Sequence, residues 1–259
     1  MFAICACWKP ATLSNNNPQS LIPDPLSPKQ EKTLNPFGII SFSSETLGII
    51  GVTLRMSLAS TFIASFIGTI LGLFLERGRF PGKRIAVRIC RTLMGTPPVV
   101  AGLVVYLLLM RRGPFGAWGI LFTVQAMVIA QVLIITPIVA GMVYTYASRS
   151  APAIRSFAKT MGASPFQTQL LLVKEMSGEI YFSIITAFSR AISEVGAVMI
   201  VGGNIQYKTR TMTTAISMLR NTGDFAQGIT LGILLLLIAF ALQSLSDLLH
   251  KGEMPEDNM

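Results

Sequence analysis

Five long apolar runs constrain this chain more strongly than any other feature of its sequence. They cover about residues 54–75, 93–110, 120–146, 180–201 and 229–245. An α-helix needs roughly 20 apolar residues to cross a bilayer, so each run is a candidate span. The strict alternation of apolar and polar residues that marks the strands of a membrane β-barrel is missing from them. We therefore expect an all-α integral membrane protein with five transmembrane helices.

The composition agrees with a chain whose surface faces lipid. Charged residues make up 13% of the sequence and hydrophobic residues 51%, whereas a soluble domain carries about 25% charged residues. The net charge of +9 would indicate nucleic-acid binding in a soluble protein, but in a membrane protein such an excess usually marks cytoplasmic loops. We expect the lipid bilayer around the chain and no nucleic-acid partner. The three cysteines form no CxxC pair, so we expect no metal site.

The loops between the runs differ in charge, and this difference predicts the orientation of the chain. Basic residues gather in the loop after the first run and in the loop after the third: Arg77, Arg79, Lys83, Arg84, Arg88 and Arg91, then Arg149, Arg155, Lys159 and Lys174. Cytoplasmic loops are enriched in Lys and Arg, so both loops belong in the cytoplasm. The N-terminus then lies outside the cell and the C-terminus inside. Lys208 and Arg210, in a loop placed outside, do not follow the pattern.

The two ends of the chain differ from the apolar runs. Residues 1–43 contain a run of asparagines and several prolines, a composition that cannot build a packed core. It predicts a disordered extension or an over-long gene start. The transmembrane domain is expected over 44–248, with residues 44–55 lying along the membrane surface before the first span. Residues 249–259 are expected to form a cytoplasmic tail.

Residues 147–177 form the longest loop that we place in the cytoplasm. In this loop Gly162 is a turn residue, and Ser164 followed by Pro165 is typical of an N-cap and a first helical position. The pattern predicts a helix–turn–helix across the membrane surface, with Phe166 among its apolar side chains. Two interpretations stay open: the loop packs on its own bundle, or it docks a cytoplasmic partner.

The same loop resembles the EAA loop of ABC importer permeases. Ala158 matches the last residue of that motif and Gly162 its glycine, whereas Ser156 and Phe157 replace its Glu-Ala pair. In that family the loop forms a short coupling helix that binds a groove on the ATPase. The resemblance implies the following ATPase-coupling residues: Ala158, Lys159, Gly162, Ala163, Ser164, Pro165 and Phe166.

Two further stretches resemble the permeases of oxyanion importers. One runs from Gly95-Thr96-Pro97-Pro98 to Tyr106, and the other contains Ser193-Glu194-Val195-Gly196-Ala197 followed by Gly202-Gly203-Asn204-Ile205. Molybdate permeases have Gly-Glu-Phe-Gly-Ala in the second stretch, and the version in this chain is most similar to tungstate-type permeases. The resemblance covers about residues 45–248 and implies the type I ABC importer permease fold.

The resemblance also implies a function and a set of partners. It implies a permease subunit that moves an oxyanion, tungstate first, from an extracytoplasmic oxyanion-binding protein across the bacterial inner membrane into the cytoplasm. The permease would act as a homodimer with the pathway at the subunit interface. Cytoplasmic ABC ATPase subunits would bind ATP and Mg, and this chain would hold no cofactor and perform no hydrolysis itself.

The fourth apolar run contains charged and polar residues at helical spacing. Ser183, Thr186, Arg190, Ser193 and Ala197 recur every three or four residues, which places them on one face of a continuous helix. Arg190 and Glu194 are four residues apart and can pair, and each would cost about 2.5–3.5 kcal/mol alone at the bilayer centre. One interpretation is a charge pair that holds two helices together. The other assigns an anion pathway to these residues: Ser183, Thr186, Arg190, Ser193, Glu194 and Gly196.

In the pathway interpretation the two charges have different roles. Arg190 attracts the anion, and Glu194 limits how tightly the anion is held, because a pore that binds too well cannot release. Helix breaks or hinges, which a moving permease needs, are predicted at Gly95, Pro97, Pro98 and Pro137.

Motifs that the sequence lacks exclude some of the other possible functions. No G-x-x-x-x-G-K-[ST] motif occurs, so this chain has no P-loop for ATP. The only histidine, His250, follows the last run, which excludes a Ser–His protease inside the membrane. A permease for molybdate, sulfate or phosphate stays open. So do two other classes: an intramembrane lipid-modifying enzyme that uses Arg190 and Glu194, and a membrane scaffold or sensor that transports nothing.

Overall fold

The described part of the chain is built from helices. The computed structural model describes residues 44–78 and 80–250, and no strand occurs among them, which confirms the all-α prediction for that part. The expected extension (1–43) and nearly all of the expected tail (249–259) lie outside the described residues. The elements are α1 (Ser44–Arg77), α2 (Lys83–Met94), α3 (Pro98–Leu109), η3 (Gly116–Trp118), α4 (Val124–Thr160), α5 (Pro165–Glu175), α6 (Ser177–Ser193), α7 (Gly196–Gly202), α8 (Met212–Thr222) and α9 (Phe225–His250).

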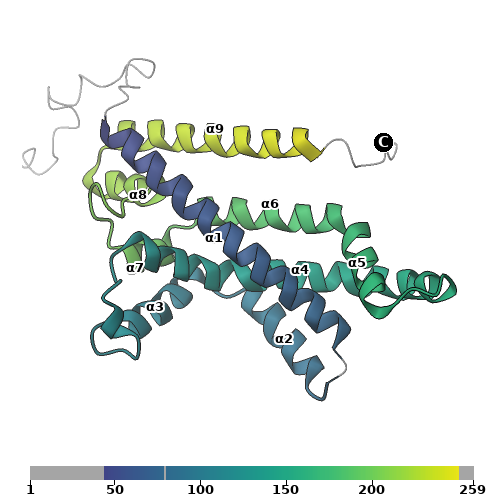
Figure 1. Cartoon of the computed structure of the whole chain (residues 1–259). Coiled ribbons are helices and arrows are strands. Elements are labelled where there is room, and N and C mark those ends of the chain that lie inside the picture. Colours follow the sequence, from purple (N-terminus) through teal and green to yellow (C-terminus); the bar gives the residue numbers. More distant parts are fainter. Residues whose placement is uncertain (1–43, 79, 251–259) are drawn as a thin grey trace, which may run out of the picture. The chain divides into compact units, whose positions relative to one another are not determined.

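Three helices are long and apolar enough to cross a membrane by themselves. They cover Thr46–Arg77, Val124–Thr160 and Phe225–Leu245. Two bent pairs pass the same test together: the chain bends by 104° between α2 and α3 and by 58° between α6 and α7. Each of the five apolar runs therefore lies in one of these helices or pairs, which gives three to five candidate spans (Figure 1).

Three local features differ from the sequence-based expectations. α4 continues as a helix through Pro137, so the helix is not interrupted there, and a hinge at Pro137 stays a prediction. Neighbouring helices can support a proline inside a membrane helix, and α1, α2 and α6 all pack on α4. Residues 44–55 are the first turns of α1 rather than a separate surface segment. The apolar runs do not predict α8, which begins with a capping box between Thr211 and Thr214.

α1 and α4 lie close together because two glycines of α1 leave room for α4. Gly68 and Gly72 have the G-x-x-x-G spacing that lets membrane helices approach. A Cβ atom added at Gly68 would lie 2.7 Å from the Cβ of Val139, and one at Gly72 would lie 2.8 Å from the carbonyl oxygen of Ala140. A buried cluster extends this contact to α6: Ala64, Ile135, Val139, Val143, Ala187 and Ala191. The three helices therefore form the packed centre that positions the rest.

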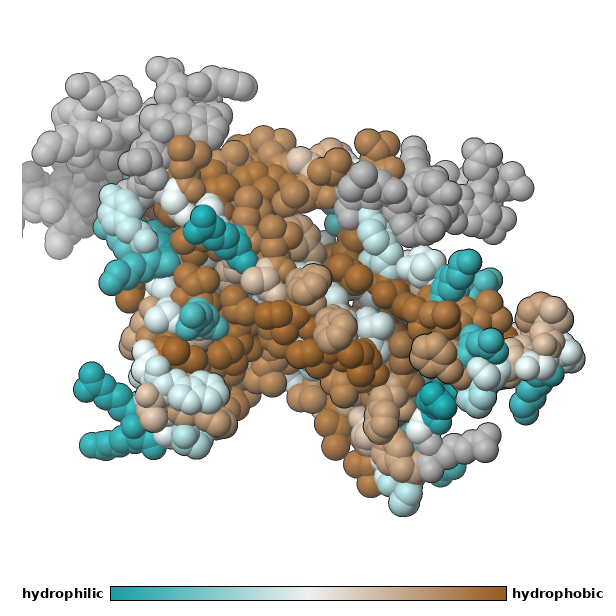
Figure 2. Space-filling model, in the orientation of Figure 1, coloured by the Kyte–Doolittle hydropathy of each residue, from teal (hydrophilic) through white to brown (hydrophobic). Residues whose placement is uncertain are grey.

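Large apolar side chains cover much of the outside. Phe62 is 78% exposed and Phe240 is 73% exposed. Figure 2 shows brown, hydrophobic surface across the middle of the visible face, with most of the teal, hydrophilic surface toward the left and right ends. An exposed apolar surface of this extent needs lipid or a partner to cover it, so the distribution fits a chain embedded in a bilayer.

We expect Gly72→Ala to destabilise the protein, because the new methyl group would meet the backbone of α4. Overpacking of this kind costs about 1–3 kcal/mol, and thermal unfolding in detergent should show a lower melting temperature. Gly51→Ala on the same helix is the matched control, since nothing lies within 4 Å of a Cβ there. The control should keep the wild-type melting temperature or raise it. Equal melting temperatures for the two variants would contradict the close α1–α4 contact.

Candidate functional site

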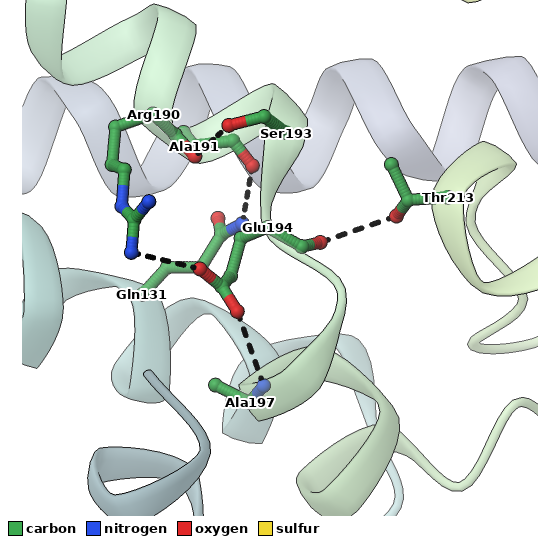
Figure 3. Close-up of polar contacts among 7 residues, drawn as sticks. All are labelled: Gln131, Arg190, Ala191, Ser193, Glu194, Ala197 and Thr213. Atoms are coloured by element: carbon green, nitrogen blue, oxygen red, sulfur yellow. Dashed lines mark hydrogen bonds and ion pairs between the residues drawn. The ribbon is translucent and has the colours of Figure 1, made fainter. Parts of the chain in front are cut away.

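A helix break inside the fourth apolar run brings the charged residues together. α6 ends at Ser193 and α7 begins at Gly196, and Glu194 has an extended backbone between them. Its carboxylate accepts a hydrogen bond from the backbone N–H of Ala197 (3.3 Å) and lies 3.5 Å from the guanidinium of Arg190. Its carbonyl oxygen accepts a hydrogen bond from the hydroxyl of Thr213 on α8 (3.1 Å; Figure 3). Glu194 therefore connects α6, α7 and α8.

The two charges of this pair differ in exposure. The side chain of Glu194 is 6% exposed, whereas that of Arg190 is 40% exposed. A buried carboxylate is stable only when it is paired and hydrogen-bonded, and Glu194 meets both conditions. Arg190 pairs with Glu194 while part of its side chain stays exposed, so its positive charge can still attract a second anion.

An amide that the sequence analysis did not single out holds the last turn of α6. Gln131 of α4, which is 1% exposed, donates from Nε2 to the carbonyl oxygen of Ala191 (2.8 Å) and accepts from the hydroxyl of Ser60 on α1 (2.6 Å). We call Ser60, Gln131 and Ala191 the amide bridge. It joins three helices one turn before the break, and Gln131 and Ala191 lie beside Arg190 and Glu194 (Figure 3).

The polar face predicted for a continuous helix is only partly present. The helix ends at Ser193, so Ala197 lies on α7 instead, and its place on that face is wrong. Ser183 is buried and donates to the carbonyl oxygen of Glu179 (2.8 Å), while Thr186 donates to that of Phe182 (2.9 Å). Ser193 is exposed. Arg190, Ser193, Glu194 and Gly196 are thus brought together at the break, and Ser183 lies two turns away among packed residues.

The break between α2 and α3 lies against the break between α6 and α7. The expected break is confirmed at its place: α2 ends at Met94, Gly95 follows, and Pro97 caps α3 with Pro98 as its first residue. A Cβ atom at Gly102 of α3 would lie 2.6 Å from the Cα of Ala197, and one at Gly196 would lie 2.7 Å from a methyl carbon of Val99. The two bent segments therefore touch directly beside their breaks.

The predicted helix–turn–helix is present at the far end of α4. Gly162 has a φ of +68°, which favours glycine, and Ala163 N–H donates to the carbonyl oxygen of Ala158 while Gly162 N–H donates to that of Lys159. This pair of bonds is the Schellman motif that closes helix ends. Ser164 then caps α5, and Gln167 completes a capping box.

The two sides of this loop differ in exposure. Ala158 is 1% exposed, and Leu172 and Met176 of α5 pack on Ala147 and Ala151 of α4, which fixes the loop on its own bundle. On the other side four apolar side chains are 59–76% exposed: Phe157, Met161, Phe166 and Leu170. We call these four residues the turn patch. Lys159, Ser164 and Pro165 beside it are also exposed.

An ion pair ties this loop to the other helices at the same end. Arg155 of α4 pairs with Glu76 of α1 at 2.6 Å, and the carboxylate of Glu76 is 7% exposed. Lys83, the first residue of α2, donates to the backbone carbonyl oxygen of Glu76 (2.7 Å). The end of α1, the start of α2 and the last turns of α4 are thus fixed to one another. Among the described residues no group of three or more His, Cys, Asp or Glu side chains could hold a metal ion.

Sequence comparisons match most of the chain to transport proteins. The family model described as "Binding-protein-dependent transport system inner membrane component" matches residues 64–253. The tungstate uptake system permease protein TupB of Peptoclostridium acidaminophilum is 41% identical over 206 residues, which cover 80% of this chain and 90% of that protein. The TupB protein of Campylobacter jejuni is 37% identical over 172 residues, covering 66% of this chain and 72% of that protein.

A solved structure shares the fold at low sequence identity. The crystal structure of an amino acid ABC transporter with histidines superposes with a TM-score of 0.61, covering 85% of this chain and 99% of that chain. The identity is 15%, so this likeness concerns the fold alone.

Proposed function

This chain belongs to the family of binding-protein-dependent transport system inner membrane components, and we propose that the substrate it carries into the cell is tungstate. The chain is the permease subunit of an ABC importer for oxyanions, lies in the inner membrane, and is a transporter subunit rather than an enzyme. One observation carries the choice of tungstate: 41% identity over 90% of the length of a tungstate uptake permease.

Members of this family work with a binding protein and an ATPase. We propose the following subunit arrangement and topology for this transporter. The permease forms a homodimer with the pathway between its two copies. Two cytoplasmic ATPase subunits bind ATP and Mg, and an extracytoplasmic oxyanion-binding protein delivers the substrate. All five apolar runs cross the membrane in the type I arrangement, with the N-terminus outside and the C-terminus in the cytoplasm.

The positions of the helix ends support this topology. α1 and α4 run in the same direction, because Gly68 lies against Val139 and Gly72 against Val143, and two parallel spans need one span between them in the opposite direction. The end that carries Glu76, Lys83 and Arg155 also contains most of the described basic residues, as expected for the cytoplasmic side. α9 ends at the side where α4 ends (Figure 1).

The turn patch is the proposed docking site for the ATPase. It is apolar, exposed and fixed at the cytoplasmic end of the longest helix. Exposed aromatic and Met side chains on a rigid turn are typical of the centre of a protein–protein interface. The buried side of the loop holds the turn in place, so a movement of the ATPase can be passed to α4.

Arg190, Ser193, Glu194 and Gly196, with Thr186 one turn earlier, are the proposed lining of the pathway. Support comes from the exposed part of the Arg190 guanidinium and from the two adjacent helix breaks, where a small movement can open or close a gap. Ser183 is left out of the lining because it is 0% exposed and its hydroxyl is bonded to the carbonyl oxygen of Glu179 within its own helix.

We expect Arg190→Ala to lower tungstate uptake while the complex still assembles. A hydrogen bond to a charged group contributes about 1.5–3 kcal/mol, which corresponds to a roughly tenfold to hundredfold loss of rate. Arg190→Lys keeps the charge and should retain part of the uptake. Uptake into proteoliposomes is the measurement, and Arg220→Ala, an exposed arginine of α8, is the control. An assembled Arg190→Ala complex that transports like the wild type would exclude a pathway role.

We expect Phe166→Ala to weaken binding of the ATPase without unfolding the permease, because the ring is 76% exposed. Central aromatic side chains of interfaces contribute about 2 kcal/mol or more, so much less ATPase should co-purify with the variant. Phe225→Ala, which removes a 62% exposed ring near the opposite end of the bundle, is the matched control. Unchanged co-purification for Phe166→Ala would place the docking site elsewhere.

The substrate is tested by ATPase activity of the complete transporter in proteoliposomes with its binding protein. Tungstate should stimulate ATP hydrolysis at the lowest concentration, ahead of molybdate, sulfate and phosphate. Stimulation by sulfate or phosphate alone would contradict tungstate as the substrate, but it would still support the role of the chain as a permease subunit. Failure of any ATPase to co-purify with the chain would contradict the importer itself and favour a scaffold or a lipid-modifying enzyme.

A further inference from the structure

The helix α2 has three different faces. One face contacts α4: the Sγ of Cys90 lies 3.5 Å from the carbonyl oxygen of Pro137, Met94 fills the space beside Gly141, and Lys83 lies 6.0 Å from the ring centroid of Tyr144. No residue of α2 is fully buried. The two outer faces, one basic and one apolar, are therefore open in the described chain.

The basic face is a row of three arginines. Arg84, Arg88 and Arg91 follow one another at intervals of four and three residues, and all three are exposed. The ion pairs found among the described residues involve other arginines, Arg155 and Arg190. Three positive charges on one flank of a helix add up to a local positive potential, which attracts a negatively charged ligand.

The apolar face lies beside the arginines and is hollow. Ile85, Ile89 and Leu93 are 63%, 54% and 46% exposed. Together with Arg88 and Thr92 they line an open hollow of about 260 Å³. The lining of the hollow thus combines three apolar side chains with one arginine and one threonine.

In the proposed orientation, α2 lies at the level of the lipid headgroups. Lys83 is bonded to the end of α1, at the side of the bundle that the proposed topology puts in the cytoplasm. α3 contains no charged residue, whereas α2 contains four and is bent away from α3 by 104°. The uncharged helix belongs in the hydrocarbon, and the amphipathic one belongs where its arginines reach phosphates.

We infer that the outer surface of α2 binds an anionic phospholipid of the cytoplasmic leaflet. The arginine row takes the phosphate of the headgroup, and an acyl chain lies along Ile85, Ile89 and Leu93. Basic clusters at the cytoplasmic end of a span attract anionic lipids, and long arginine side chains can reach the interface while their stems cover apolar surface. A free oxyanion could bind the arginine row but would make no contact with the apolar hollow. A phospholipid can contact both faces, so it fits the outer surface of α2 better than the transported ion does. The inference rests on the proposed orientation and not on the choice of tungstate.

The test compares lipid binding to the purified transporter by native mass spectrometry. Phosphatidylglycerol should remain bound to the wild type in preference to phosphatidylcholine, and the triple variant Arg84→Gln, Arg88→Gln, Arg91→Gln should lose that preference, by about fivefold for each arginine removed. Arg88→Lys alone should keep it. The matched control removes three exposed arginines placed outside the cell, Arg111, Arg112 and Arg220, and should bind phosphatidylglycerol like the wild type.

Three outcomes would overturn the inference. Equal binding of the two lipids to the wild type would show that the arginines recognise no headgroup. Displacement of phosphatidylglycerol by millimolar phosphate or tungstate would assign the row to a free oxyanion. Disulfide cross-linking of an Ile89→Cys variant into dimers within native membranes would show that a second copy of the chain covers this face. Tungstate-dependent ATPase activity of the same wild-type sample tests the proposed function separately, so the two can fail independently.

Discussion

The interruption of α6 at Glu194 depends on partners for the backbone groups that a helix break leaves free. In a bilayer no water replaces these partners, and each unsatisfied group costs several kcal/mol. Here the carbonyl oxygen of Ala191 is taken by Gln131, that of Glu194 by Thr213, and the N–H of Ala197 by the carboxylate of Glu194. Two neighbouring helices, α4 and α8, and the side chain of Glu194 itself therefore stabilise the break.

The same arrangement explains why a carboxylate and a guanidinium can sit in an apolar run. Glu194 is held by a backbone N–H as well as by Arg190, so its charge does not depend on Arg190 alone. This leaves the exposed part of Arg190 available to another anion. The two interpretations of Arg190 and Glu194, a structural charge pair and part of an anion pathway, are therefore compatible.

Sequence patterns predict the local features of this fold well, because each depends on neighbours in the chain. The turn at Gly162 and the cap at Ser164 follow from which residues tolerate those backbone positions, and both are present. The G-x-x-x-G spacing of Gly68 and Gly72 is visible in the sequence and indicates a close helix–helix contact, but it does not say which helix packs there. Pro137 could not be interpreted from its neighbours in the chain alone, because whether a proline interrupts a helix depends on the helices packed around it.

Contacts between distant residues could not be predicted in this way. Gln131 finds Ser60 and Ala191 across separations of 71 and 60 residues. An amide within an apolar run signals that some partner exists, but nothing in the sequence says which. Likewise, the i,i+4 pairing of Arg190 with Glu194 is a local rule, whereas the end of the helix at Ser193, which moved Ala197 off the predicted face, follows from bonds to α4 and α8.

α4 provides a physical route from the proposed motor to the proposed pathway. Its 37 residues form one helix about 55 Å long. That helix carries Gln131 near one end and leads at the other into the turn patch. Near that second end Arg155 is fixed to Glu76, so α1 must move with it. In the proposed mechanism, a displacement of the turn is passed along α4 to the bond between Gln131 and the last turn of α6. Because α7 touches α3 beside both breaks, the proposed change at Glu194 needs no further connection to act on the second bent segment.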